Sequence, residues 1–173
     1  MTNDSAKSRV VVVGGGAGGL ELVTKLGDRY RKREDIEIVL VDANHTHIWK
    51  PLLHEVAAGT LNSNDDELSY LAQSHWHHFE FRLGRLKAIN RRDKTIDIEG
   101  SSDQHGNEYI PPRTLPYDYL VIAVGSVTND FGIQGVAEHC FFLDQRRQAD
   151  DFHQYLVRTC YAVSYTHLRA HET

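Results

Sequence analysis

A run of four valines that leads directly into a glycine-rich turn constrains this chain more than any other feature. Residues 10–13 are typical of a strand buried on both faces of a parallel sheet, and residues 20–26 predict a helix after the turn. Between them, Gly14, Gly16 and Gly19 fit the pattern G-x-G-x-x-G. In such a fingerprint the first glycine permits a sharp turn, the second lets the backbone approach a pyrophosphate, and the third lets helix and strand pack closely.

A second apolar stretch, and the acid that ends it, extend this pattern. Residues 36–41 predict a strand, and Asp42 follows at about 20 residues beyond the glycines, where a dinucleotide fingerprint places an acid. Its carboxylate would accept hydrogen bonds from both hydroxyls of an adenosine ribose, and its charge would repel a 2′-phosphate. The pattern therefore favours FAD or NAD over NADP. The alternative is an ordinary strand–helix–strand unit with an acidic turn residue.

Length and charge limit the possible classes of protein. With 173 residues, we expect one domain, or one domain with a piece of another. The net charge of −5 provides no general basic surface, so we do not expect a nucleic acid partner. We see no secretion signal, no run of the ~20 apolar residues that cross a bilayer, and too few cysteines for a disulfide framework. A cytoplasmic location is therefore expected.

The rest of the chain predicts short strands and two helices. A helix is expected after a cap at Asn64 or Asp65, and its buried face would carry Leu68, Leu71, Ala72 and His75. A last helix is expected to end near Arg158, and the tail beyond it follows no regular pattern. Strands are predicted at residues 79–83, in a hairpin of residues 86–89 and 95–98, at an edge near Tyr109, and at residues 117–124.

Histidine and cysteine residues could have two chemical roles here, as metal ligands or as a nucleophile. His75 and His78 have the spacing of metal ligands on a helix, but no carboxylate or cysteine partner is identifiable nearby, so we expect no metal site. Cys140 could be a nucleophile, although a small buried residue is favoured because no histidine pairing can be argued. We therefore expect no catalytic amino acid.

Four stretches resemble the amino-terminal third of a bacterial type II NADH dehydrogenase, the non-pumping NADH:quinone oxidoreductase of the two-dinucleotide-binding-domain flavoprotein superfamily. The resemblance extends from about Arg9 to about Tyr155. The Lys-Pro-Leu-Leu-His-Glu-Val-Ala run is more specific than the glycine turns, which the whole superfamily shares. The four stretches begin at Gly14 (GGGAGGLE), Val41 (VD-x-NH), Trp49 (WKPLLHEVA-x-G) and Tyr117 (YD-x-LV-x-A-x-GS).

This resemblance implies an α/β, Rossmann-like FAD-binding domain with a parallel sheet, helices and an inserted antiparallel β-meander. It also implies that FAD, rather than NAD, occupies the first fingerprint. The implied cofactor-binding residues are Gly14, Gly16 and Gly18 with Ala17 and Gly19 at the pyrophosphate, Asp42 at the ribose, Leu86 beside the adenine, Lys50 and Pro51 near the flavin, and Ala123, Val124 and Gly125 beneath the cofactor.

The reaction implied by the resemblance is transfer of a hydride from NADH to the flavin, followed by transfer of two electrons to a membrane quinone. The flavin supplies the redox chemistry, and the protein supplies position and electrostatics. The parent protein is expected to be a peripheral membrane protein on the cytoplasmic face of the inner membrane, and it could be a homodimer.

Two departures from the superfamily pattern are visible. Val23 stands where many members have glycine or alanine, so we expect slightly wider packing of helix on strand. No Cys-x4-Cys pair lies near Pro51, which argues against disulfide reductases, and Cys140 alone does not suit a sulfide:quinone reductase.

We expect the chain to be truncated, because no second glycine fingerprint follows the first. The expected division is a disordered stretch at residues 1–8, an incomplete FAD-binding domain at 9–145, a helix at 146–159 that leads toward an NADH-binding domain, and a tail at 160–173 that resembles translated sequencing-adapter read-through. Such a chain would be inactive alone and would bind FAD weakly. The alternatives are a non-catalytic module for NAD or another ADP-nucleotide, or another pyridine-nucleotide-dependent flavoprotein reductase.

Overall fold

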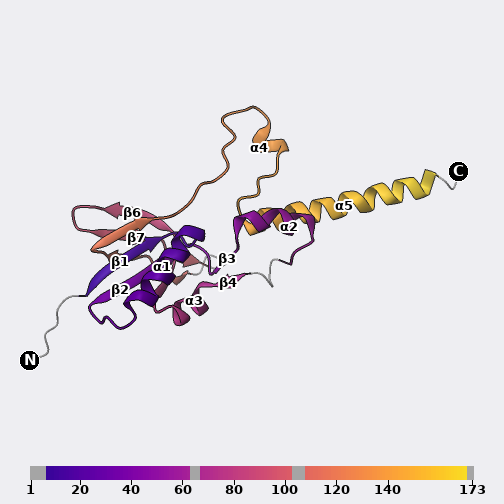
Figure 1. Cartoon of the computed structure of the whole chain (residues 1–173). Helices are drawn as coiled ribbons and strands as arrows, with labels where there is room; N and C mark the ends of the chain where they lie inside the picture. The colour runs from indigo at the N-terminus through magenta and orange to yellow at the C-terminus, as the bar shows by residue number, and fades with distance from the viewer. Residues whose placement is uncertain (1–6, 63–66, 103–107, 171–173) are drawn as a thin grey trace, which may run out of the picture. The chain divides into compact units, whose positions relative to one another are not determined.

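The computed structural model describes residues 7–62, 67–102 and 108–170, and the chain forms two compact units (Figure 1). The first unit comprises Met1–His47 and Leu68–Gly125, and the second comprises Ile48–Glu67 and Ser126–Thr173. These units do not follow the expected boundary at residue 145, because the segment that begins at Ile48 groups with the residues that follow Ser126.

The first unit is built on a four-stranded parallel sheet. Val11 on the central strand pairs with Leu120 on one side and with Val39 on the other. Because all four strands run the same way, their carboxyl ends lie at one edge of the sheet. The strand order is β11-β1-β2-β5, with β1 at Ser8–Val13, β2 at Ile36–Asp42, β5 at Glu80–Leu83 and β11 at Tyr119–Ile122.

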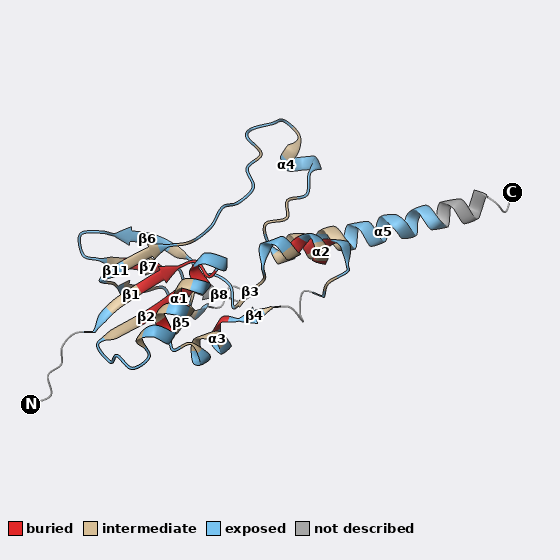
Figure 2. Cartoon of the chain, viewed as in Figure 1, coloured by how far each residue is buried: buried red, intermediate tan, exposed pale blue. Residues whose placement is uncertain are grey.

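Both faces of β1 are buried, as the run of valines predicts. Val12 belongs to one apolar cluster together with Leu20 and Val23 of α1 (Ala17–Tyr30). Val11 and Val13 belong to a second cluster that includes Ile96 and Ile98. Successive side chains of a strand point to opposite faces, so the helix covers one face of the sheet and other strands cover the opposite face. Figure 2 shows this burial along β1 and β2.

The second face is covered by the expected antiparallel meander. Its strand order is β10-β7-β6, and Ile96 of β7 pairs with Ile89 of β6 and with Leu115 of β10. The hairpin predicted from sequence is therefore confirmed, and so is the edge strand near Tyr109. The strands of the meander are β6 at Leu86–Asn90, β7 at Thr95–Ile98 and β10 at Arg113–Pro116. Two short strands, β8 at Ser101–Ser102 and β9 at Glu108–Ile110, pair with each other in a separate antiparallel sheet.

The short helix predicted around residues 68–75 differs in its start and in its buried face. Leu68–Ser69 forms a strand, β4, which pairs with β3 (Thr46–His47), and the helix α3 runs only over Tyr70–Trp76. Its cap is Ser69, and the expected caps Asn64 and Asp65 lie outside the described residues. Tyr70, the first residue of this helix, is buried in the apolar cluster that contains Leu20 and Val23, whereas Leu71 is 70% exposed.

The second unit consists of helices. Its core contains Leu53, Val56 and Ala57 of α2 and Ala149 of α5. The elements are the 3-10 helix η1 at Lys50–Leu52, α2 at Leu53–Ala58, α4 at Val136–His139 and α5 at Arg146–Ala170. No described helix in either unit is long and apolar enough to cross a membrane.

Two sequence expectations in the second unit are wrong. The helix expected to end near Arg158 continues to Ala170, because neither proline nor glycine interrupts residues 146–170 and a formed helix adds one hydrogen bond for each further residue. Cys140, expected to be buried, is exposed, because it lies just past the end of the short helix α4.

The close packing of α1 leads to a stability prediction. A Cβ atom at Gly27 would overlap the carbonyl oxygen of His77 and lie 3.2 Å from the carbonyl carbon of His78. We expect Gly27→Ala to lower the free energy of unfolding by about 1–3 kcal/mol, although alanine favours helices, because overpacking outweighs propensity. Urea unfolding followed by Trp76 fluorescence in a Trp49→Phe background would report on the first unit alone.

The matched control is Gly18→Ala in the same helix. A Cβ atom at Gly18 would meet no atom within 4 Å, so only the propensity effect remains. We expect this variant to be as stable as the parent or more stable. Equal effects of the two substitutions would contradict the packing argument.

Candidate nucleotide-binding site

The glycine turn after β1 lies against the end of β11. Gly14 has a φ of +103°, and a Cβ atom there would overlap the Ala123 carbonyl and lie 2.7 Å from the nitrogen of Val124. The backbone nitrogen of Gly14 donates to Val41 (2.8 Å), and that of Ala123 donates to Val13 (2.7 Å). The first glycine therefore permits both a left-handed turn and a close approach between two chain segments.

Gly19 allows α1 to begin directly above this turn. A Cβ atom at Gly19 would overlap the carbonyl oxygen of Gly14 and lie 3.3 Å from the Cβ of Ala123. The helix begins ahead of its apolar residues, because the nitrogen of Leu20 already donates to the oxygen of Gly16 (2.9 Å). Val23, the departure noted from the superfamily pattern, is fully buried in the apolar cluster on this face.

The opening of α1 is uncapped and exposed. Gly16 precedes the helix and provides no side-chain cap, and a Cβ atom at Gly16 or Gly18 would meet nothing within 4 Å. The residues from Gly16 to Gly18 are exposed. Because the first N–H groups of a helix have no partner inside it, this exposed start offers donors and the positive end of the helix dipole to an anion.

Asp42 lies beside the same turn. Its Oδ2 accepts a hydrogen bond from the Gly15 nitrogen (2.6 Å), and its Oδ1 accepts from the backbone nitrogen (2.8 Å) and side-chain amide (3.1 Å) of Asn44. A carboxylate offers about four acceptor positions, so these three donors leave one for a ribose hydroxyl. The sequence indicated Asp42, but not its bond to Gly15.

Tyr70 is a residue at the turn that the sequence analysis missed. Its hydroxyl donates to the carbonyl oxygen of Gly15 (2.7 Å), and its side chain is 2% exposed. Burial raises the pKa of Tyr70, and the charge of Asp42 acts in the same direction. No sequence signal marked Tyr70, because the periodic pattern assigned its neighbours to the buried face.

The remaining expected residues of the first unit lie along the sheet and the meander. The nitrogen of Gly84 donates to the carbonyl oxygen of Asp42 (2.8 Å). This hydrogen bond connects the end of β2 to the segment between β5 and Leu86. Leu86 is half-buried and packs against the second apolar cluster. Beyond Ala123, Val124 is 63% exposed and Gly125 has a φ of +71°.

Lys50 and Pro51 belong to the second unit and are described within it. The Nζ of Lys50 donates to the carbonyl oxygen of Ser126 (2.6 Å) and lies 3.4 Å from the Oδ1 of Asp144, and Pro51 is exposed in η1. The nitrogen of Thr128 donates to the Oδ2 of Asp144 (2.8 Å). This hydrogen bond lowers the pKa of Asp144, and Lys50 acts in the same direction.

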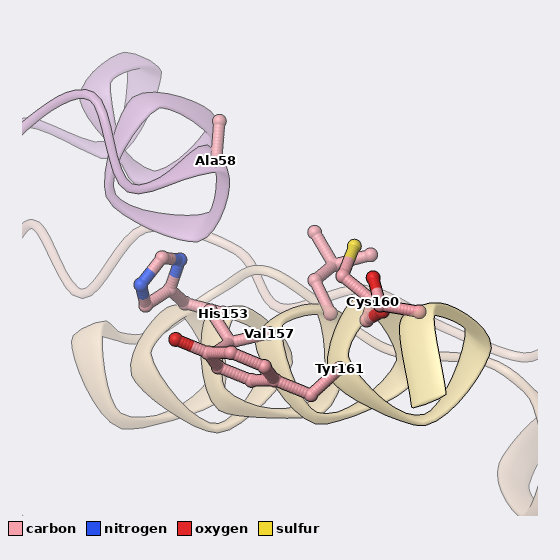
Figure 3. A pocket seen from close by; sticks show the side chains of 7 residues that line it. Ala58, His153, Val157, Cys160 and Tyr161 are labelled. Carbon is pink, nitrogen blue, oxygen red and sulfur yellow. The ribbon is translucent and has the colours of Figure 1, made fainter. Parts of the chain in front are cut away.

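The second unit also contains a cavity of about 440 Å³ between α2 and α5 (Figure 3). Its walls include Ala58 of α2 and, from α5, His153, Val157 and Tyr161. The Nδ1 of His153 is buried and has no hydrogen-bond partner among the residues that the structure describes. None of the residues expected to bind a cofactor lines this cavity.

Comparison with known proteins decides the family. Residues 8–164 match the pyridine nucleotide-disulphide oxidoreductase family. The chain belongs to this family. Its members bind FAD, so the cofactor and the fold class expected from the resemblance are confirmed.

Among curated relatives, the chain is similar to proteins named type II NADH:quinone oxidoreductase. Identity is 47% over 148 residues with the protein from Haemophilus influenzae, covering 86% of this chain and 33% of the relative. It is 29% over 142 residues with the protein from Staphylococcus aureus strain NCTC 8325, covering 80% of this chain and 31% of the relative. The chain thus spans about a third of the length of these relatives.

Solved structures show the same fold. NDH2 from Plasmodium falciparum aligns with a TM-score of 0.71 and 23% identity, over 90% of this chain and 30% of that chain. The sulfide:quinone oxidoreductase from Aquifex aeolicus aligns with a TM-score of 0.68 and 24% identity, over 90% of this chain and 32% of that chain.

The environment of Asp144 leads to a prediction about pH. A carboxyl group whose pKa is lower in the folded state stabilises that state above its unfolded pKa of about 3.9, and this contribution is lost as the pH falls through the folded pKa. We therefore expect Asp144→Asn to lower the free energy of unfolding at pH 7 by about 1 kcal/mol, and the difference to disappear in strong acid. Urea unfolding followed by Trp49 fluorescence in a Trp76→Phe background would measure it.

Asp151→Asn is the control for this experiment. Asp151 is exposed and lies 3.9 Å from the Nε of Arg147 on the same helix, a geometry that contributes little to stability. A loss at pH 7 as large as that of Asp144→Asn would contradict the role given to the Thr128 and Lys50 contacts.

Proposed function

We propose that this chain is the FAD-binding part of an NADH:quinone oxidoreductase, in which NADH donates electrons and a membrane quinone accepts them. The 47% identity to a relative of that name supports this proposal. The Lys-Pro-Leu-Leu-His-Glu-Val-Ala run at the start of the second unit supports it too, because it is more specific than the glycine turn.

The observation that carries the proposal is the open start of α1 beside a fixed carboxylate. Gly16 and Gly18 leave space for a pyrophosphate, and Asp42 is bonded to the same turn with an acceptor position left for a ribose hydroxyl. These two features suit the ADP half of FAD. Gly14 and Gly19 keep the turn close to the sheet, so that the backbone, rather than a side chain, meets the diphosphate.

The other expected residues complete this assignment. Leu86 would flank the adenine, Lys50 and Pro51 would approach the flavin, and the turn that begins at Ala123 and ends at Gly125 would pass beneath the cofactor. Lys50 is bonded to a carbonyl and lies near a carboxylate, which holds its ammonium group at a defined place in the second unit.

Bound FAD supplies the chemistry that accepts a hydride and passes on two electrons. The chain's own residues bind the cofactor and orient it. The first turn of α1 provides N–H donors for the diphosphate, and Asp42 distinguishes a free ribose from a 2′-phosphate by charge. No side chain needs to act as a nucleophile in this scheme.

The location and assembly of the parent protein follow from its substrates. A quinone is dissolved in the membrane, so we propose that the complete protein binds peripherally to the cytoplasmic face of the inner membrane, where NADH is present. A homodimer is part of the same proposal.

FAD binding tests the site. We expect the purified chain to bind FAD with a Kd above about 1 µM, because the glycine turn and Asp42 serve only the ADP half of the cofactor. Gly16→Ala is expected to weaken binding at least about tenfold, because its Cβ would occupy the space of the pyrophosphate. Flavin fluorescence anisotropy would measure both constants.

The controls distinguish loss of FAD binding at the site from unfolding of the protein. Gly16 has a φ of −58° and open surroundings, so Gly16→Ala should unfold in urea as the parent does. Calorimetry with NAD in place of FAD tests the alternative function. Preference for NAD would indicate a nucleotide-binding module, and unchanged FAD affinity of Gly16→Ala would place the cofactor elsewhere.

A further inference from the structure

The buried hydroxyl of Tyr70 donates a hydrogen bond to the carbonyl oxygen of Gly15 in the glycine turn. The bond to the Gly15 oxygen is 2.7 Å long and joins residues 55 positions apart in the chain. The tyrosine is itself fixed, because its nitrogen donates to the carbonyl oxygen of His45 (3.1 Å) and its ring packs against Phe81 with centroids 5.2 Å apart. The donor to the turn is therefore held in place by its own contacts.

Both polar groups of the Gly15 backbone are engaged by side chains. Asp42 accepts from its N–H group, and Tyr70 donates to its C=O group. A Cβ atom at Gly15 would lie 2.6 Å from the Cε1 of Tyr70, so the turn and the ring are in direct contact. The conformation of the turn thus depends on this ring and on this carboxylate.

The peptide bond between Gly15 and Gly16 transmits this constraint to the ligand side. The described residues include no cis peptide bond, and in a trans peptide the C=O and N–H groups point in opposite directions. Because the Gly15 oxygen points to buried Tyr70, the Gly16 N–H points to the open, exposed side of the turn. A hydrogen bond accepted by the carbonyl also polarises the peptide and strengthens its N–H as a donor.

We propose that Tyr70 is a positioning residue of the nucleotide site, which directs and polarises the Gly16 N–H group toward the diphosphate and steadies the Gly15 N–H group that holds Asp42. This proposal rests on the proposed function, because it presumes a diphosphate at the start of α1. A tyrosine hydroxyl is protonated at neutral pH and burial raises the pKa of Tyr70 further, so the hydroxyl remains a donor.

The test is Tyr70→Phe in the full chain, with ADP as the probe. We expect the ¹⁵N and ¹H resonances of the Gly16 amide to shift in the free protein, because its peptide loses a hydrogen bond, and the Kd for ADP to rise about tenfold. Two-dimensional NMR would record both the amide signature and the titration. A residue that only supported the fold would not change the Gly16 resonance selectively.

Tyr109→Phe is the matched control. Tyr109 lies in the same unit, in β9, and is 59% exposed. We expect this variant to keep the parent's Gly16 resonance and ADP affinity. If Tyr70→Phe does not fold, Phe81→Leu loosens the tyrosine ring without removing its hydroxyl, and smaller changes in the same direction are expected.

The outcomes separate the two proposals. Parent-like ADP affinity or an unchanged Gly16 resonance in Tyr70→Phe, or in Phe81→Leu where that variant replaces it, would overturn the positioning role alone. No binding of ADP or FAD by the unmodified chain would overturn the proposed function, and the positioning role with it. A Gly16 shift together with weakened ADP binding supports both.

Discussion

The structure of the first unit depends on a backbone contact that leaves no room for a side chain. Gly14 and Gly19 bring the end of β1, the start of α1 and the end of β11 together, and a Cβ atom at either position would overlap a carbonyl group. Because the turn is so tight, α1 begins with its uncapped N–H groups at the surface. The steric constraint therefore creates the electrostatic feature that suits an anion.

Hydrogen bonds with Asp42 and Tyr70 further fix the conformation of the glycine turn, which the steric contact already limits. Asp42 is the last residue of β2, and its carboxylate reaches the turn after β1 because neighbouring parallel strands end at the same edge. Tyr70 approaches the same turn from α3 and is buried in the cluster that also holds α1 on the sheet. Core packing and the geometry of the glycine turn are thus coupled through the Gly15 peptide.

In the second unit, the local sequence around a residue predicts little about which residues it contacts or whether it is buried. Lys50 lies in a stretch that is more specific than the glycine turn, yet the residues that its ammonium group contacts, Ser126 and Asp144, lie 76 and 94 positions away. Cys140, apolar by type, lies exposed after a four-residue helix. The contacts and burial of such residues depend on where distant segments of the chain meet, which a periodic sequence pattern does not predict.

The amino-acid sequence by itself indicated the strands, the glycine turn, the acid at Asp42 and the hairpin of residues 86–98, because each rests on the pattern of a short stretch or on a fixed spacing along the chain. The resemblance of four stretches to one family added the meander and the cofactor. Only the tertiary structure decided that Tyr70 faces the Gly15 carbonyl and that Asp42 holds the Gly15 N–H group. The physical reason is that these bonds join residues 55 and 27 positions apart, and only the folded sheet and its covering helices bring those residues together.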